Sequence, residues 1–286
     1  PVHMDLIDWL AADFMDHGWD VKRLLKTIVM SRTYRQSSSM EPGARSMEKS
    51  AIASDSLRHA PSSLLIDPEN RLFARGPRFR MPSFMLRDQA LAISGLLSPK
   101  VGGPAVKPYQ PDGIWEPVAF GGSNTKNYIQ DHGESLYRRS LYTFWKRTAP
   151  PPNMTSFDAP NRESYCLRRE RSNTPLQALT LMNDVQFFEA ARAFAQQAMK
   201  ASPSTDARIT RLFRAATSRF PSAQEAEVIR QTFDKHLAAY TAKPEEAKKV
   251  ITNGESKPDA ALNPVELASW TMIANLVLNL DEAVTK

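Results

Sequence analysis

The sequence loses its helical periodicity between residues 102 and 174, and this interruption restricts the possible folds more than any other feature. Clusters of glycine and proline follow one another there, and each favours a turn: Gly102-Gly103-Pro104, Pro111-Asp112-Gly113, Gly121-Gly122 and Pro150-Pro151-Pro152. A stretch this long without regular structure is uncommon inside a compact domain and often carries function. A long irregular insert between helical flanks is therefore predicted.

Both flanks carry apolar residues at helical spacing. Two helices are expected within residues 3–31, with Gly18 between them and Asp20 capping the second, and another over 82–97. After the insert, helix starts are indicated at Thr174-Pro175, at the capping box of Ser222 and Glu225, and at Asn263-Pro264. Residues 35–60 read as a linker ending in a short helix, and 140–145 (SLYTFW) as a short strand.

The fold class that follows is mainly α: a multi-helix domain with a Pro/Gly/aromatic-rich central insert and at most a few short strands. We expect residues 1–286 to form one domain, with sub-lobes at 1–100 (N-terminal helices), 101–173 (insert) and 174–286 (C-terminal bundle).

Composition excludes several classes of protein. Apolar residues make up 42% and charged residues 24%, as in soluble globular domains. No run approaches the roughly 18–20 apolar residues of a membrane span. The first residues carry aspartates where a signal peptide would be apolar, and the start at Pro1 reads as a piece of a longer protein. The single cysteine, Cys166, excludes an internal disulfide, a cysteine-cluster metal site and c-type haem attachment.

Basic residues are concentrated around the end of the insert. The chain has 37 basic and 31 acidic residues, a net charge of +6, and this excess can attract an anionic partner. Arg168, Arg169 and Arg171 directly precede the helix that Thr174 is expected to cap. Free backbone N–H groups, the helix dipole and bidentate guanidinium groups together favour an anion there. The alternative is that these arginines pair with Asp158, Glu163 and Glu170 and are structural.

Aromatic residues are also concentrated in the insert. Aromatic faces suit sugar rings, and arginines beside them suit sulfate or uronate groups. The candidate ligand-binding residues are therefore Trp115 and Trp145 for stacking, with charge and capping from Arg138, Arg147, Arg168, Arg169, Arg171 and Thr174. The alternative is that the aromatics form a small core of the insert.

Four residues are weak candidates for acid–base catalysis: Asp131, His132, Asp158 and Glu163. Adjacent residues of the Asp131–Glu134 loop cannot all face one ion, so no metal site is predicted. Cys166 with His132 would make a nucleophile–base pair, but a buried, inert thiol is the favoured interpretation. Phosphate-binding loops, serine elbows and nucleic-acid-binding modules are not recognisable.

Several long motifs carry a family resemblance: 70–97 (NRLFARGPRFRMPSFMLRDQALAISGLL), 102–111 (GGPAVKPYQP), 138–152 (RRSLYTFWKRTAPPP), 157–163 (FDAPNRE) and 168–179 (RRERSNTPLQAL). With the helical ends, they make the chain resemble the planctomycete-specific domain of unknown function found near the C-terminus of planctomycete cytochrome c domain proteins. The family brings no catalytic residues to carry over. The resemblance implies an extracytoplasmic location, upstream domains of the same polypeptide as partners, and haem on a separate domain with no cofactor in this chain.

The leading hypothesis is an accessory domain that binds an anionic or glycan ligand or a partner cytochrome-type domain. A hydrolase or redox-coupled enzyme acting on polysaccharide is the first alternative, and a scaffold that packs on upstream domains is the second. Whether the domain is an enzyme is left open by the sequence.

Overall fold

The computed structural model describes residues 2–36 and 67–285. Their contacts divide them into two compact units, one reaching Phe79 and the other running from Arg80 to Thr285. The helix expected near residue 83 thus belongs with the C-terminal helices. The predicted linker and short helix at 35–60 lie almost entirely outside the described residues.

The first unit contains the two predicted N-terminal helices, α1 (Met4–Asp16) and α2 (Val21–Met30). Gly18 and Trp19 both adopt positive φ and reverse the chain between them. The Asp20 carboxylate accepts a hydrogen bond from the Arg23 backbone N–H at 3.1 Å, which confirms the predicted cap. Asp13 of α1 pairs with the Arg23 guanidinium and joins the helices.

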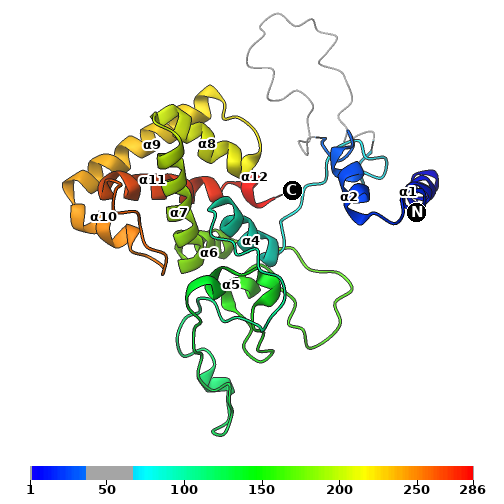
Figure 1. Ribbon diagram of the computed structural model, residues 1–286, viewed down its shortest axis with the longest axis horizontal. Helices are drawn as coiled ribbons and strands as arrows, with labels where there is room; N and C mark the ends of the chain where they lie inside the picture. The colour runs from blue at the N-terminus through cyan, green and yellow to red at the C-terminus, as the bar shows by residue number, and fades with distance from the viewer. Residues whose placement is uncertain (1, 37–66, 286) are drawn as a thin grey trace, which may run out of the picture. The chain divides into compact units, whose positions relative to one another are not determined.

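The second unit is a helical bundle built around α7 (Val185–Ala201) and α11 (Pro264–Leu278), which cross near its middle (Figure 1). Ala190, Ala191, Ala195 and Ala198 on α7 are fully buried, and such small side chains let two helix backbones approach closely. On α11 the large side chains of Trp270 and Ile273 are fully buried too. This apolar contact forms the main core.

The remaining helices surround this pair: α4 (Ser83–Ile93), α5 (Pro152–Thr155), α6 (Pro175–Asn183), α8 (Thr205–Thr217), α9 (Ala223–Ala242), α10 (Pro244–Ile251) and α12 (Asp281–Val284). The predicted starts are confirmed: Ser222 and Glu225 form the capping box of α9, and Asn263 accepts from two N–H groups of α11. The mainly α fold class is therefore confirmed. Within the described ranges, no helix is long and apolar enough to cross a bilayer.

The insert is irregular, as predicted. Besides α5, it contains the short 3₁₀ helices η3 (Glu116–Val118), η4 (Gly133–Tyr137) and η5 (Ser140–Tyr142). The predicted strand at 140–145 is wrong, because η5 occupies its first half. Only Thr143 forms a bridge, with Val106, so the segment lacks the ladder of partners that a strand needs.

Buried arginine side chains, not a β-sheet, bind the backbone carbonyls of the insert. Arg87 of α4 is 2% exposed and donates to the carbonyl oxygens of Arg138 at 2.8 Å and Leu136 at 2.7 Å. Burial lowers the pKa of Arg87 to about 10. Arg138 is buried in turn and donates to the carbonyls of Gly102 and, at 2.9 Å, Pro104. The two guanidinium groups therefore satisfy backbone acceptors that no strand partner reaches.

Candidate functional site

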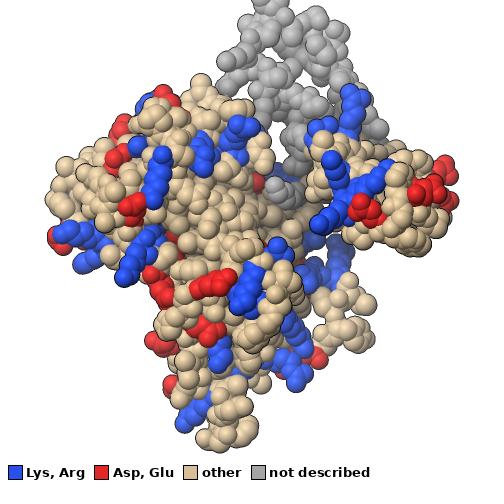
Figure 2. Space-filling model, viewed as in Figure 1, with Lys and Arg blue, Asp and Glu red and all other residues tan. Residues whose placement is uncertain are grey.

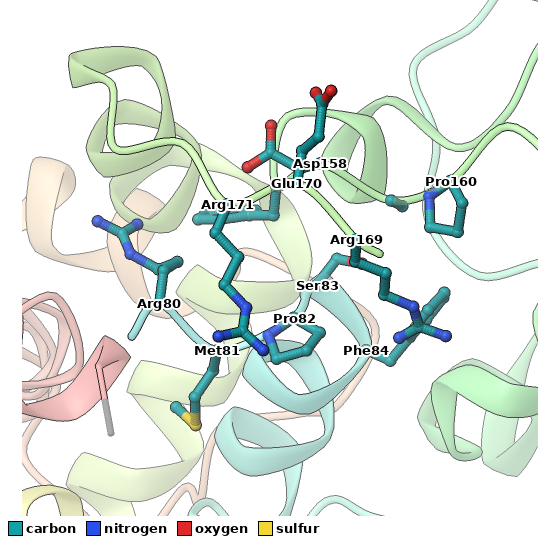
Figure 3. Close-up of a pocket in the computed structure, with 12 residues that line it drawn as sticks. Arg80, Met81, Pro82, Ser83, Phe84, Asp158, Pro160, Arg169, Glu170 and Arg171 are labelled. Atoms are coloured by element: carbon teal, nitrogen blue, oxygen red, sulfur yellow. The ribbon is translucent and has the colours of Figure 1, made fainter. Parts of the chain in front are cut away.

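A narrow pocket lies at the N-terminus of α4, where the end of the insert folds back over the helix (Figure 3). The enclosed space of the pocket holds about one water-sized group. The residues before and at the start of α4 line one side of the pocket, and two stretches of the insert line the other. On the α4 side these are Arg80, Met81, Pro82, Ser83 and Phe84, and on the insert side they are Phe157, Asp158, Ala159, Pro160, Arg169, Glu170 and Arg171.

The first turn of α4 offers hydrogen-bond donors to this pocket. Pro82 is the N-cap residue, and no side chain caps the turn. The first N–H groups of a helix have no partner inside the helix, and they carry the positive end of its dipole. Ser83 is only 3% exposed, and its hydroxyl has no hydrogen-bond partner. A buried, unsatisfied hydroxyl costs free energy unless a ligand pairs with it.

Arginine side chains surround this turn. Arg80 donates to the Gln177 side-chain oxygen at 2.9 Å and to Asn173, while its buried Nε has no hydrogen-bond partner. Burial lowers the pKa of Arg80. The Arg169 guanidinium lies 5.2 Å from the centre of the Phe84 ring. Figure 3 shows the side chains of Arg171 and Arg169 running toward Pro82 and Phe84, away from the carboxylates of Asp158 and Glu170.

Asp158 fixes the part of the insert that closes the pocket. It adopts a φ of 57° and accepts hydrogen bonds from Ser172, at 2.6 Å from the backbone N and 2.8 Å from Oγ. Gln177 donates to the same Ser172 Oγ at 2.9 Å. The loop 159–171 is therefore closed at its base by a network that continues through Gln177 to Arg80. Asp158 is occupied in a structural contact.

Arg162 and Trp145 lie beside the pocket. The Arg162 guanidinium is 4.4 Å from the Trp145 ring centre and 5.8 Å from that of Phe84. Burial lowers the pKa of Arg162, and the charge of Arg169 lowers it further. Trp145 donates from Nε1 to the Asn161 carbonyl at 3.0 Å. Of the two candidate tryptophans, Trp145 is thus the one near the pocket, and its ring contacts an arginine of the chain itself.

Thr174 begins α6, as the sequence indicated, and forms a capping box with Gln177. The start of α6 is therefore capped by side chains of the protein itself. Within residues 2–36 and 67–285, Arg168 and Arg169 form no ion pair with Asp158, Glu163 or Glu170. Arg169 and Arg171, which precede α6 in sequence, line the pocket at the start of a different helix, α4, whereas Arg168 lies outside that pocket on the exposed loop.

Three other candidate residues lie away from the pocket. Trp115 is 2% exposed and packs on Tyr128 and Phe144, with Lys146 Nζ 4.9 Å from its ring centre. It belongs to a small core of the insert, the alternative considered for the aromatics. Arg138 is buried against carbonyls, and Arg147 is exposed.

The acid–base candidates do not converge. Asp131 accepts from the Lys107 backbone N–H at 2.7 Å, whereas His132 pairs with Glu255 at 2.7 Å. Glu163 is exposed on the loop 159–171. No group of three potential metal ligands occurs in the described part of the chain. Cys166 is exposed, so the expectation of a buried thiol is wrong; it lies at the outer part of a loop that has no core of its own.

Sequence reasoning missed one buried polar cluster. Glu189 and Arg192 of α7 are each 1% exposed, and Tyr137 donates to Glu189 at 2.9 Å. Ser256 donates to the same carboxylate oxygen from its N–H at 2.6 Å, and burial raises the pKa of Tyr137 to about 12, with Glu189 adding to the shift. The cluster joins the insert, α7 and the loop before α11. Its signal was a Glu–Arg pair at i, i+3 in an alanine-rich helix, where charge is unexpected.

Comparison with curated proteins and with solved structures found no match. One family model, described as PSD1, protein of unknown function (DUF1553), matches residues 1–233, which is most of the chain. The match includes the insert and every residue that lines the pocket. The chain therefore belongs to the PSD1 family of proteins of unknown function (DUF1553).

Proposed function

We propose that this domain is an accessory binding module whose pocket at the N-terminus of α4 receives an anionic group of its ligand. The observation that carries the proposal is the buried Ser83 hydroxyl, which has no partner and lies in an uncapped first helical turn. The unpartnered Arg80 Nε and the Arg169 guanidinium line the same pocket. A carboxylate, sulfate or phosphate oxygen would accept hydrogen bonds from the Ser83 hydroxyl and the first N–H groups of α4, and the arginines that line the pocket would add positive charge around it.

The charge distribution supports a local site. On the face seen in Figure 2, basic and acidic side chains are interspersed over the helices, which does not favour binding through a broad single-sign field. Anion selectivity would then come from the few donors in the pocket. An extracytoplasmic location and packing on upstream domains remain part of this proposal, supported by the family resemblance.

Thermal unfolding in inorganic sulfate tests the site. A ligand at about 100 times its dissociation constant adds roughly 2.7 kcal/mol to the free energy of unfolding. Sulfate also stabilises proteins without binding them, because it is excluded from their surface. The comparison is therefore with Ser83→Ala, which removes one pocket donor and leaves the general salt effect unchanged.

Thr143→Val is the matched control, because Thr143 also has a buried hydroxyl without a partner but does not line the pocket. We expect the sulfate-specific part of the stabilisation to be clearly smaller in Ser83→Ala and to persist unchanged in Thr143→Val. An equal response of both variants and the wild type to sulfate would refute the anion site.

A further inference from the structure

We infer that the ligand of this pocket is an acidic protein segment that lies along the loop 159–171 and inserts one carboxylate side chain at the start of α4. This inference rests on the proposed function and adds the class of ligand. It follows from the size of the pocket, from the positive charge of Arg162, Arg168 and Arg169 and from the side chains exposed beside it.

The size of the pocket limits what can enter. Its depth admits about one water-sized group, so the tip of a functional group fits and a whole sugar ring does not. The rest of any ligand must lie on the surface next to the pocket. An open groove along residues 158–170 continues from it, and Asp158, Pro160 and Arg169 line both.

The charge around the groove is complementary to an acidic segment. Arg162, Arg168 and Arg169 form no ion pair within residues 2–36 and 67–285. The pair Arg162 and Arg169 both lie against Phe84, so two like charges are held near one ring. A carboxylate placed between them would relieve their repulsion and accept hydrogen bonds from both.

The side chains beside the groove distinguish a protein from a glycan. Tyr165 is 88% exposed and Leu167 is 94% exposed, and both line the groove. A tyrosine ring suits a sugar or an apolar side chain, but an aliphatic leucine gains burial only against another apolar group. Two neighbouring arginines beside an exposed tyrosine and an exposed leucine fit a protein segment in which apolar residues flank an aspartate or glutamate.

The base of the loop is fixed to the rest of the unit. Hydrogen bonds between Asp158 and Ser172 close this base, and Trp145 Nε1 donates to the carbonyl of Asn161 near the start of the loop. The exposed residues are thus presented on a closed loop, and a partner would not have to order a free chain end. Closing the base shortens the segment that a ligand has to order, and this lowers part of the entropic cost of binding.

The test is selection of short random peptides displayed on phage against the immobilised full chain, followed by titration of the selected synthetic peptides. We expect the selected peptides to carry aspartate or glutamate next to aliphatic or aromatic residues, and inorganic sulfate to displace them. Changing the acidic residue to its amide should weaken a peptide by at least about tenfold. Selection of peptides without a required carboxylate would overturn the inference.

Two sets of variants separate this inference from the proposed function. Tyr165→Ser with Leu167→Ser should weaken the peptides by about tenfold or more and leave sulfate stabilisation intact. Phe120→Ser with Leu141→Ser is the matched control, since those residues are 77% and 74% exposed and do not line the pocket or the groove. Peptide affinity unchanged in the first double variant would overturn the inference while the anion site stands.

A sulfated hexasaccharide provides the third comparison. Binding of this oligosaccharide in preference to every selected peptide would overturn the protein ligand and keep the anion site. If sulfate did not stabilise the wild type beyond its general salt effect, the proposed function itself would be refuted. The two proposals therefore fail by different measurements.

Discussion

Replacing Gly254 by alanine should destabilise the domain strongly, because that glycine lies against the buried Glu189 side chain. Gly254 adopts a φ of 85°, and a Cβ atom there would lie 2.3 Å from Glu189 Cδ, 2.6 Å from Cγ and 2.7 Å from Cβ. Glu189 cannot move aside easily, since its carboxylate accepts from Ser256 and Tyr137 and its Cβ is fixed to α7.

The magnitude follows from three contributions. A positive φ costs alanine about 1 kcal/mol, and overpacking of a filled interior costs roughly 1–3 kcal/mol. Displacing the Glu189 carboxylate would leave buried groups without partners at about 1 kcal/mol or more. We therefore expect Gly254→Ala to lower the free energy of unfolding by about 4 kcal/mol. In a unit of this size that corresponds to a fall in Tm of roughly 10 °C.

Thermal unfolding followed by circular dichroism measures this, with Gly113→Ala as the control. Gly113 has a similar φ of 77°, but nothing lies within 4 Å of the Cβ position. It should lose about 1 kcal/mol from backbone strain alone. If Gly254→Ala and Gly113→Ala lower Tm equally, the close contact with Glu189 and the rigidity of that cluster are refuted.

Three further predictions concern charge and exposure. Arg87→Met should lower the free energy of unfolding by about 3 kcal/mol, because buried carbonyls lose their donor. Arg147→Met, at an exposed position, should change it by less than about 0.5 kcal/mol, and chemical denaturation of the two variants measures the difference. Hydrogen bonding to Arg219 lowers the pKa of Glu225 from 4.5 to about 2, so the stability that this contact adds is complete above pH 4.5 and lost as the pH falls to 2. Glu225→Gln should accordingly be less stable than the wild type by about 1 kcal/mol at pH 7, allowing for solvent screening, and a difference that persists at pH 2 would contradict this reasoning. Cys166 should react with a thiol reagent in the native protein at the rate of a free exposed thiol, and protection lifted only by denaturant would place it in a buried environment.

The helices could be predicted because their signals are local. Asp20, Ser222 and Asn263 each bind N–H groups within three residues, so the cap and its partner appear together in the sequence. The irregular insert was likewise evident from its glycines and prolines. The expected strand at 140–145 failed because β-propensity does not reveal whether a partner strand exists.

The pocket could be predicted only in part. The sequence predicts an anion site for the arginines near 169 at the start of α6, the next helix along the chain. Their actual neighbour is the start of α4, which tertiary folding brings to them, and Ser83 gave no sequence signal at all. Trp115 and Arg138 carried the right chemistry for a ligand, yet only packing determines that one is core and the other holds backbone carbonyls.

The insert is held mainly by arginines that bind backbone carbonyls, and this has a consequence for how the family can vary. A carbonyl group is the same at every residue, so Arg87 and Arg138 recognise the path of the chain and not the side chains along it. An exposed residue such as Pro104 can be exchanged without loss of the anchor, provided that the backbone keeps its course, whereas the buried side chain of Leu136 is restricted by packing as well. Substitutions should therefore accumulate in the loops that surround the two arginines sooner than at the arginines themselves, and the loop surface can be remodelled for new ligands on an unchanged frame.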